Sequence, residues 1–436
     1  MADVFLGMRG TGDWVTDQRP LNWRKQLLKI YPNGSMPLTA ILSMMGEESV
    51  DDPQFNWWTE GMPVLSGTIT GVYTNVGLSN AYTSGGVAGS PLFIKMAEAD
   101  AIKLRVGHQV LLRDASEPTV DVNAKVEEVV KNGASSYASV RLLEIDDNGA
   151  TAQKDLSDAD TFMIIGNINP EGGEMPDAQA FNPTKYYNYT QIFRTSLSIT
   201  RTARLTNLRT PADYQKMKSE ALEIHGLEME QAFWWGIRTE RVGDNGKPER
   251  TTAGFIPWIR DNVPANIFNY ATDTDYSSDP WLTSGEDFIN DNLEVLFRYG
   301  AGEKLAICGS GAILAIQKLA KAGADITLVP GAPAYGIKVM TWITPFGVIH
   351  LKTHPLFSYE ATTRNTMVVL EPKFLKYRYI TDTTFYPEAE KQNTGRGRID
   401  GTDEEYLTEC GLEFHHPQTA GVFYNMGQNN TVSTGG

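Results

Sequence analysis

The chain has 436 residues, with 38 Lys+Arg against 53 Asp+Glu and a formal net charge of −15. Its 41% hydrophobic and 21% charged residues are typical of an ordinary folded protein with roughly two to three structural units, which excludes fibrous and broadly disordered classes. Such an acidic chain repels nucleic acid unless its basic residues gather on one face, because phosphate binding requires concentrated positive charge.

Residues 1–58 are predicted to form an N-terminal arm. Asp3 stands where a signal peptide carries basic charge, and no apolar core follows it. Within residues 20–34, PLNWRKQLLKIYPNG, the side chains Trp23, Leu27 and Ile30 recur at helical spacing beside the basic residues Arg24, Lys25 and Lys29. The Pro-Asn-Gly at 32–34 ends this turn. A short apolar helix candidate and an acidic turn then lead to Trp57 and Trp58.

Residues 59–185 are predicted to form an extended loop that carries an inserted β subdomain at about 102–168. Three runs, VGHQVLLRD, VDVNAKVEEVV and YASVRLLEID, have strand character, and Asn132-Gly133 is a hairpin signal. Glycine-rich flanks, SGGVAGS before and NPEGGEMPD after, indicate an insertion into a longer excursion.

Residues 186–251 contain an extended segment rich in Thr and Ser at 188–210, followed by a long helix at about 212–237. On this helix we expect Leu222, Met229 and Phe233 on the side that faces the rest of the domain. The glutamates, Glu230 included, are expected to face solvent or partners, and Gly226 indicates a close backbone contact.

Residues 252–357 are predicted to hold a helix that begins at Ser284, which Asp287 would help to cap, and ends at Tyr299. A strand at 304–308, a Gly-Ser-Gly turn, a helix at 312–322 and a hairpin turning at 345–347 follow. Residues 358–436 supply further strands and a C-terminal tail with no reason to fold. Since helices and strands are mixed without regular βαβ alternation, the predicted class is α+β.

The stretch EALEIHGLEMEQAFWWG, residues 220–236, places one histidine among glutamates and invites interpretation as a metal site. A zinc-protease helix requires His-Glu-x-x-His, and a di-iron bundle requires paired Glu-x-x-His segments. Here His225 is the one imidazole, Glu228 lies one turn further on, and no second matching segment exists. We therefore predict an amphipathic helix and no metal.

Two other motifs resemble ligand sites. CGSG at 308–311 is similar to a phosphate-binding turn, but Leu314 stands where a dinucleotide fold needs glycine, and no Lys-Ser/Thr pair follows. DTDYSSD at 273–279 begins like a calcium loop and lacks its glycine and its final glutamate. We predict no catalytic, cofactor or metal residues. Two cysteines, Cys308 and Cys410, make no disulfide framework, which favours a reducing cytoplasm.

Several aromatic rings stand in segments that read as extended and poorly buried by their own chain. Rings of this kind persist when another subunit covers them. We expect a subunit interface formed by Trp57, Trp58, Tyr187, Tyr189 and Phe193. Basic residues gather in the arm and in the loop with Arg396 and Arg398, where contact with phosphate or an acidic neighbour and ordinary solvated charge stay open as alternatives.

Four segments together resemble the major capsid proteins of tailed bacteriophages, and the SU-ten-type major head protein family in particular. They are PLTAILSMMGEESVDDPQFNWW, NYTQIFRTSLSITRTARL, the long helix with GIRTER after it, and DEEYLTECGLEFHHPQTAGVF. The resemblance implies the Hong Kong 97-type fold: an arm at 1–58, an extended loop at 59–185, a peripheral domain with its spine helix at 186–251, an axial domain at 252–357, and a return to the peripheral domain at 358–436.

The resemblance also implies a function. Many copies would associate as hexamers and pentamers into the icosahedral shell that encloses packaged double-stranded DNA, without catalysis or cofactor. The protein would be made in the host bacterial cytoplasm and reside in the virion, with cement or decoration, scaffolding and portal proteins as further partners. Two alternatives stay open: an encapsulin-like compartment that encloses cargo, and a soluble metal- or nucleotide-dependent enzyme that uses His225 and Glu228 or the CGSG turn.

Overall fold

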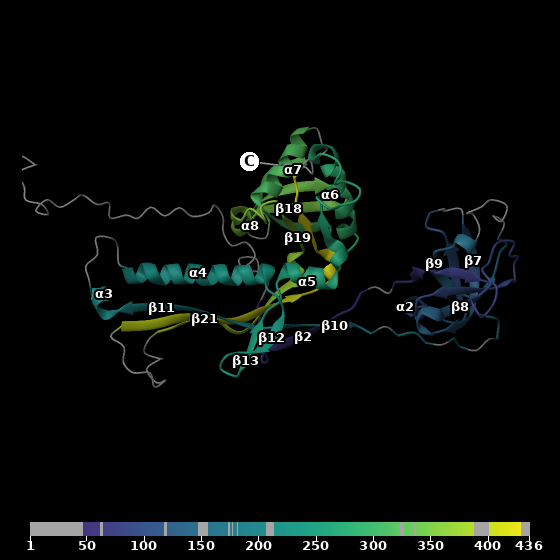
Figure 1. The fold of residues 1–436 in the computed structure, drawn as a ribbon, viewed down its shortest axis with the longest axis horizontal. Coiled ribbons are helices and arrows are strands. Elements are labelled where there is room, and N and C mark those ends of the chain that lie inside the picture. The colour runs from purple at the N-terminus through teal and green to yellow at the C-terminus, as the bar shows by residue number, and fades with distance from the viewer. Residues whose placement is uncertain are drawn as a thin grey trace, which may run out of the picture. The chain divides into compact units, whose positions relative to one another are not determined.

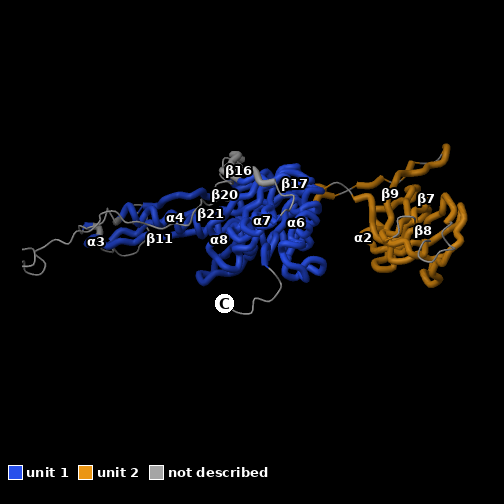
Figure 2. The backbone as a smooth tube through the Cα atoms, turned by 90° about the horizontal axis from the view of Figure 1, so that it is seen from above, with its two compact units in different colours: residues 1–59, 185–436 blue, residues 60–184 orange. Residues whose placement is uncertain are grey.

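The computed structural model describes residues 47–428, apart from 62–63, 117–119, 147–155, 173–174, 177, 181, 206–212, 323–326, 335–336 and 388–400. The arm before residue 47, the loop with Arg396 and Arg398, and the C-terminal tail therefore lie outside the described residues. The chain divides into two compact units, which Figure 2 colours separately: residues 1–59 with 185–436, here unit 1, and residues 60–184, here unit 2.

Unit 2 is built on one seven-stranded sheet. In sheet order its strands are β3 (Ser66–Thr68), β9 (Thr161–Asn167), β6 (His108–Arg113), β7 (Asp121–Val130), β8 (Ser136–Leu142), β5 (Pro91–Met96) and β4 (Gly71–Tyr73), and the short helix α2 (Glu98–Ala101) follows β5. The three predicted β runs correspond to β6, β7 and β8, and the antiparallel β7–β8 pair confirms the hairpin expected near Asn132.

The sheet of unit 2 closes into a barrel. Its two outermost strands, β3 and β4, are consecutive pieces of one extended segment. Between them, Ile69 N–H donates to the carbonyl of Asp160 beside β9, and Thr70 N–H donates to the carbonyl of Lys95 on β5. The interior is an apolar cluster in which Val110, Leu112 and Val140 are almost fully buried. A hydrophobic core of its own is what an independently folding domain requires.

Unit 1 contains a long four-stranded sheet with its longest helix lying along it. The sheet runs in the order β1 (Glu47–Ser49), β20 (Leu375–Tyr386), β21 (Gly401–Phe414) and β11 (Gln191–Thr200). Helix α4 (Asp213–Trp235) lies along β11 and β21 (Figure 1), which confirms the long helix predicted at 212–237. Residues 201–205, predicted as extended, instead form the short helix α3 (Arg201–Leu205).

A second sheet of unit 1 has seven strands, in the order β14 (Ile267–Asn269), β22 (Gly421–Tyr424), β19 (Met367–Leu370), β15 (Glu303–Cys308), β18 (Gly347–Thr353), β17 (Ile337–Thr344) and β16 (Thr327–Ala334). Four helices belong to this part of the chain: α5 (Phe255–Asn262), α6 (Trp281–Phe297), α7 (Ser310–Ala322) and α8 (Pro355–Tyr359). The hairpin predicted to turn at 345–347 is the β17–β18 pair.

The central strand β15 explains how unit 1 forms two cores. Successive side chains of a strand point to opposite faces of the sheet. Leu305 and Ile307 join the core that contains α4 and α5, whereas Ala306 and Cys308 join the core beneath α6 and α7. Because both faces are covered, the strand reads as a nearly continuous apolar run rather than an alternating one.

Two short ribbons complete unit 1. Strands β2 (Gln54–Thr59) and β10 (Thr184–Tyr189) pair with each other, and β12 (Thr239–Val242) forms a hairpin with β13 (Pro248–Thr251). Ser284 does not begin a helix, because α6 starts earlier, after Pro280. The buried Ser284 side chain lies inside α6 and hydrogen-bonds the hydroxyl of Tyr270 at 2.9 Å.

The mixture of helices with largely antiparallel sheets confirms the α+β class. A spine-like helix along a long sheet, a separate sheet-and-helix region, and a β-rich excursion at 60–184 are the parts that the Hong Kong 97-type fold implied. The division of unit 1 into peripheral and axial domains stays a prediction.

Candidate functional site

Four of the five predicted interface rings lie on the β2–β10 ribbon, where one is buried and three point away from the core. On β2 the side chains of Phe55 and Trp57 are buried, whereas Trp58 between Trp57 and the strand end is 61% exposed. On β10 the buried residue is Asn188, and its neighbours Tyr187 and Tyr189 are half-buried. Since side chains alternate along a strand, Trp58, Tyr187 and Tyr189 lie on the side of the ribbon that faces away from the core. We call this side the ribbon face.

The expectation that all five rings lack cover in their own chain is wrong for two of them. Trp57 Nε1 donates a hydrogen bond to the carbonyl of Phe414 at 2.8 Å, and its ring stacks near Tyr186. Phe193 on β11 packs edge-on against Phe233 of α4, with ring centres 6.4 Å apart. Both rings are core residues, because strands β2 and β11 pair with other strands and their inward side chains meet α4 and α5.

The ribbon face combines rings with one arginine. Tyr187 and Tyr189 meet edge-on with centres 5.8 Å apart. The guanidinium of Arg238 lies 3.9 Å from the centre of the Tyr187 ring and donates to the Tyr187 carbonyl at 2.7 Å. Tyrosine, tryptophan and arginine are the side chains that contribute most often to the centres of protein interfaces. This arrangement suits contact with another protein surface.

The histidine of the long helix has a structural environment. His225 is buried, its Nδ1 lies 2.9 Å from the hydroxyl of Thr195 on β11, and its Nε2 lies 2.7 Å from the hydroxyl of Thr408 on β21. Thr408 in turn bonds Thr383 on β20 at 2.9 Å. One chain of hydrogen bonds therefore joins α4 to three strands of the sheet beneath it, and both ring nitrogens of His225 are engaged.

Burial lowers the pKa of His225, because a protonated ring would lose its hydration, while Glu228 acts in the opposite direction. Among the residues that the structure describes, no three His, Cys, Asp or Glu side chains converge as a metal site would require. No local signal identifies Thr195 or Thr408 as partners of His225, since they lie on strands 30 and 183 residues away.

Glu230 faces the interior rather than solvent. Its Oε1 lies 2.8 Å from Nε2 of His354, the residue that precedes α8, and 3.3 Å from Nε1 of Trp234. The backbone N–H of Leu356 donates to Nδ1 of His354, and Nε2 of the same ring lies 3.1 Å from Nε1 of Trp234. This buried Glu230–His354 pair joins α4 to the part of unit 1 that carries α8.

Two expectations for α4 are therefore wrong. Glu230 was expected to face solvent or partners, and instead it is buried against His354, just before α8. Leu222 was expected to face the domain together with Met229 and Phe233, but it is 46% exposed whereas the other two are buried. The reason is that the covered side of the helix changes along its length: the sheet covers one side throughout, and α8 covers a second side near the C-terminal end.

The Gly-Ser-Gly turn before α7 is occupied by its own chain. The carbonyl of Arg364 accepts from the N–H groups of Gly311 and Ala312 at 3.0 and 3.2 Å, and the Ser358 hydroxyl accepts from Ser310 N–H. A Cβ atom added at Gly309 would lie only 2.2 Å from the Arg364 carbonyl oxygen. These glycines admit a neighbouring backbone, and the donors that would bind a phosphate are already used.

In the loop that begins like a calcium site, polar groups also form hydrogen bonds within the chain. The carboxylate of Asp273 accepts from the backbone N–H of Asp275 at 3.0 Å, and Tyr276 donates to Asp291 on α6.

Within the described parts of the chain, no helix combines the length and the hydropathy that a membrane crossing needs.

A family model and a curated relative each match nearly the whole chain. A family model described as SU10 major capsid protein matches residues 11–427. A major capsid protein of Pseudomonas phage PaMx41 is 21% identical over 418 residues, covering 92% of this chain and 91% of that protein. A solved structure from Mycobacterium phage Cain aligns at 10% identity over 96% of this chain and 98% of its own, with a TM-score of 0.44. The holo-SrpI encapsulin complex of Synechococcus elongatus PCC 7942 aligns at 13% identity over 58% of this chain and 78% of its own, with a TM-score of 0.38.

Proposed function

The chain belongs to the SU10 major capsid protein family and is a shell-forming phage capsid protein, and on this premise we propose that its copies associate as hexamers and pentamers around packaged double-stranded DNA. The observation that carries the proposal is the family match, which covers residues 11–427 and so includes both units. The encapsulin and enzyme alternatives have no comparable support.

We propose a structural rather than catalytic role for the whole chain. The enzyme alternative rested on His225 with Glu228, or on the CGSG turn; His225 and the CGSG turn are used for packing α4 and α7 inside unit 1. Cys308 and Cys410 are buried free thiols, which suits synthesis in the reducing cytoplasm of a bacterial host. The net charge of −15 suits a shell wall that does not bind the packed DNA strongly.

We propose the ribbon face as one of the contacts between subunits. Trp58 is a large ring that unit 1 leaves 61% exposed, and Tyr187, Tyr189 and Arg238 lie on the same face. An exposed tryptophan beside tyrosines and an arginine stabilises an interface strongly when a partner excludes water from it. Cement, scaffolding and portal proteins are further proposed partners, with no residues assigned to them.

Substitution of Trp58 tests the ribbon face. Trp58→Ala should leave the subunit folded, because the side chain is exposed, and should lower the yield of shells by about tenfold or more. Shells are counted by negative-stain microscopy and sedimentation, and folding is measured by circular dichroism. Asn56→Ala, two residues earlier on the same exposed side of β2, is the matched control and should assemble normally.

Two outcomes separate the proposals from each other. Normal shells from Trp58→Ala would remove the ribbon face from the subunit contacts while leaving the shell function intact. Failure of the unmodified protein to form closed shells, on its own or with the other head proteins of its phage, would contradict the shell function itself.

A further inference from the structure

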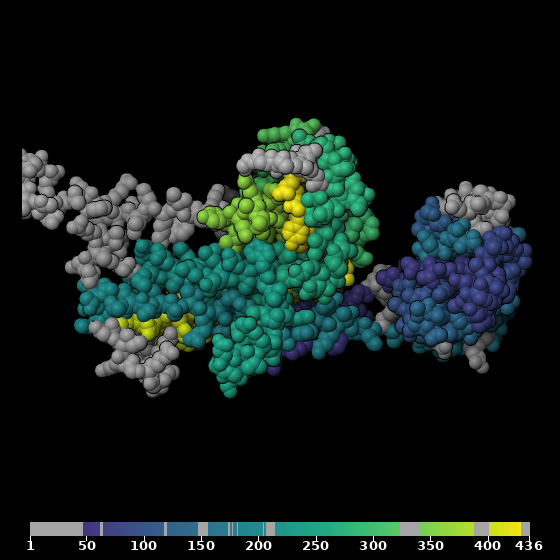
Figure 3. Space-filling model, in the orientation of Figure 1, coloured from purple at the N-terminus to yellow at the C-terminus, as the bar shows by residue number. Residues whose placement is uncertain are grey.

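The described residues of unit 1 leave one side of helix α4 uncovered. The side that faces the sheet carries the buried residues Ala221, His225 and Met229. On the opposite side stand Glu220, Glu223, Ile224 and Leu227, whose spacing of three, one and three residues places them on a single helix face. We call these four residues the outer face of α4. Atoms of α4 reach the molecular surface along this part of unit 1 (Figure 3).

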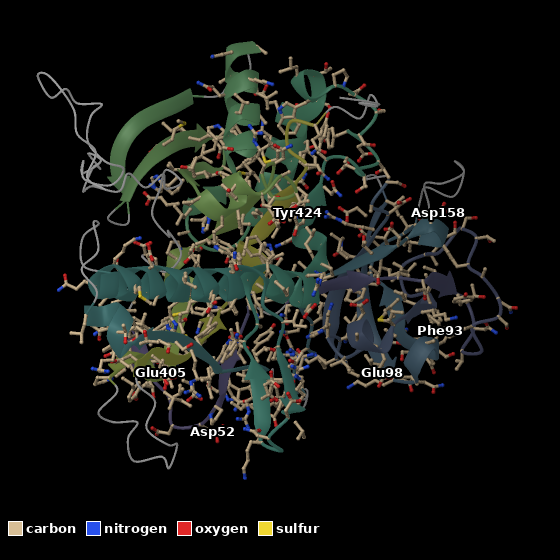
Figure 4. The ribbon with its side chains drawn as sticks, turned by 60° about the vertical axis from the view of Figure 1, so that its left-hand side comes forward. Asp52, Phe93, Glu98, Asp158, Glu405 and Tyr424 are labelled. Atoms are coloured by element: carbon tan, nitrogen blue, oxygen red, sulfur yellow. The ribbon has the colours of Figure 1, made fainter. Side chains whose placement is uncertain are left out.

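The outer face is both apolar and acidic. Ile224 is 49% exposed, which is unusual for isoleucine, and Leu227 is only partly buried. Glu220 pairs with Lys216 one turn earlier at 3.7 Å, whereas Glu223 and the adjoining Glu228 are exposed and take part in no ion pair among the described residues. Beneath the helix, Glu405, labelled below α4 in Figure 4, binds Arg194 at 2.6 Å. A ligand for the outer face would therefore be amphipathic and basic.

The arm contains a segment with these properties. Residues 20–31, PLNWRKQLLKIY, place Trp23, Leu27 and Ile30 on one side of a predicted helix. Four basic residues and no acidic residue occur between positions 19 and 31: Arg19, Arg24, Lys25 and Lys29. In a chain with a net charge of −15, such a concentration of positive charge is local and complements the glutamates of α4.

The arm can also reach the outer face of its own subunit. The described chain begins at β1, whose residues Glu47–Ser49 pair with β20 in the same sheet on which α4 lies. The 15 residues from 32 to 46 can extend over about 50 Å, and the 23 residues of α4 measure about 35 Å. Tethered in this way, the segment has an effective concentration in the millimolar range at the outer face.

We propose that residues 20–31 dock as a helix on the outer face of α4 in the unassembled subunit. Trp23, Leu27 and Ile30 cover Ile224 and Leu227, and the basic residues lie beside Glu220, Glu223 and Glu228. The docked arm removes an apolar surface from solvent before any neighbour is present. This interaction is internal to one chain, so it does not depend on the shell function.

Paired cysteines test the docking. The native thiols Cys308 and Cys410 are buried, and burial raises the pKa of both, to about 12 for Cys410, so introduced cysteines are the reactive ones. In the otherwise unmodified full-length chain, kept dilute and unassembled, Leu27→Cys with Ile224→Cys should form an intrachain crosslink with a short bismaleimide. The matched control, Lys25→Cys with Ile224→Cys, has nearly the same tether but places the thiol on the opposite side of the predicted arm helix.

The expected yield for the Leu27 pair is at least about fivefold above that of the Lys25 pair, which corresponds to about 1 kcal/mol of positional preference. Adding Glu223→Lys should reduce this yield, and adding Lys29→Glu to that variant should restore it. Equal yields for the two pairs, an interchain dimer as the main product, or no response to the charge exchange would each overturn the proposal. Intact folding of every variant is checked by circular dichroism.

Discussion

At the residue scale, the unusual feature of the chain is that its longest helix carries polar side chains into the interior. His225 and Glu230 are both almost fully buried, and each meets partners from elements far away in sequence. Burying a polar group without a partner costs more than a single hydrogen bond returns. These contacts therefore fix where α4 lies on the sheet and against α8, because any shift along the helix axis would leave several groups unsatisfied.

Glu230→Ala should destabilise the unassembled subunit by about 3 kcal/mol, because it leaves Nε2 of His354 buried without its carboxylate partner and removes one of the two hydrogen-bond partners of Trp234 Nε1. Glu230→Gln keeps an acceptor and should cost less, about 1–2 kcal/mol. Urea unfolding of the unassembled subunit measures both values. Glu228→Gln, on the same helix and exposed, is the control and should change stability by less than about 0.5 kcal/mol.

The pH dependence of stability should contain a contribution from His225. Burial lowers its pKa in the folded state, so the unfolded chain takes up the proton first as the pH falls. The contribution is complete above about pH 6.5, the ordinary value for histidine, and is lost as the pH falls through the folded pKa. His225→Gln keeps polar contact with Thr195 and Thr408 but does not titrate.

The free energy of unfolding, measured in urea at about pH 7.5 and about pH 5.5, should therefore fall less in His225→Gln than in the unmodified subunit. An equal fall in both proteins would mean that His225 takes up protons equally in the folded and unfolded states. The comparison uses the difference between two pH values, so a constant cost of the substitution does not affect it.

The sequence argues against a metal at His225 from local spacing, but it could not predict that Glu230 is buried. The absence of a second ligand at helical spacing is a local property, and it is visible in residues 220–236. The burial of Glu230 depends on His354, which lies 124 residues away and reaches α4 through the packing of α8. For the same reason, alternation along β2 could separate Trp57 from Trp58 only once the core side of the ribbon was known.

At the element scale, the end of α4 is defined by two glycines in close contact. Gly236 N–H donates to the carbonyl of Ala232, and Gly254 N–H donates to the carbonyl of Gly236 at 2.6 Å. A Cβ atom at Gly254 would lie 2.7 Å from the backbone nitrogen of Gly236. The chain that enters α5 can therefore pass directly against the last turn of α4, which brings the buried Phe255 to the Trp234 ring.

Gly254→Ala should destabilise the unassembled subunit by about 2 kcal/mol, because backbone atoms surround the added methyl group and do not move as easily as a side chain end. Thermal or urea unfolding measures the loss. Gly302→Ala is the matched control in the same unit, since no atom lies within 4 Å of the added Cβ there. A similar effect in both variants would indicate a general backbone cost rather than the contact between α4 and α5.

Elements with a local signal were predicted and those that depend on distant packing were not. The long helix, the hairpin of β7 and β8 and the β17–β18 hairpin all follow from periodicity and turn residues. The start of α6 was placed too late, because Ser284 has the composition of a cap but Trp281 is drawn into the core beside Tyr270. Tertiary contact of this kind overrides a capping preference of about 1 kcal/mol.

At the scale of the whole molecule, the chain consists of two units, each with its own sheet and its own hydrophobic core. Unit 1 surrounds its seven-stranded sheet with two apolar clusters, and unit 2 fills its barrel with a third. The chain enters unit 2 after β2 and leaves it at β10, which pair with each other. Unit 2 is thus an insertion whose two ends meet at neighbouring strands.

Residues 60–184 expressed alone should fold, because the barrel core involves no residue of unit 1. The expected result is a single cooperative thermal transition and a well-dispersed amide spectrum by nuclear magnetic resonance. Replacing Leu112, which is fully buried in the barrel, by Ala should lower its stability by about 3 kcal/mol. A disordered fragment would mean that unit 2 depends on the rest of the chain for its fold.

The closed barrel of unit 2 affects how neighbouring subunits can pair when many copies are packed side by side in a shell. Open sheet edges recruit strands from other molecules, and crowding many identical copies in one layer favours such pairing. Segment 66–73 pairs along both sides of the barrel, so each copy adds a β-rich module without adding a free strand to the lattice. Substitutions on the surface of the insertion therefore carry little risk that neighbouring subunits polymerise through its strands.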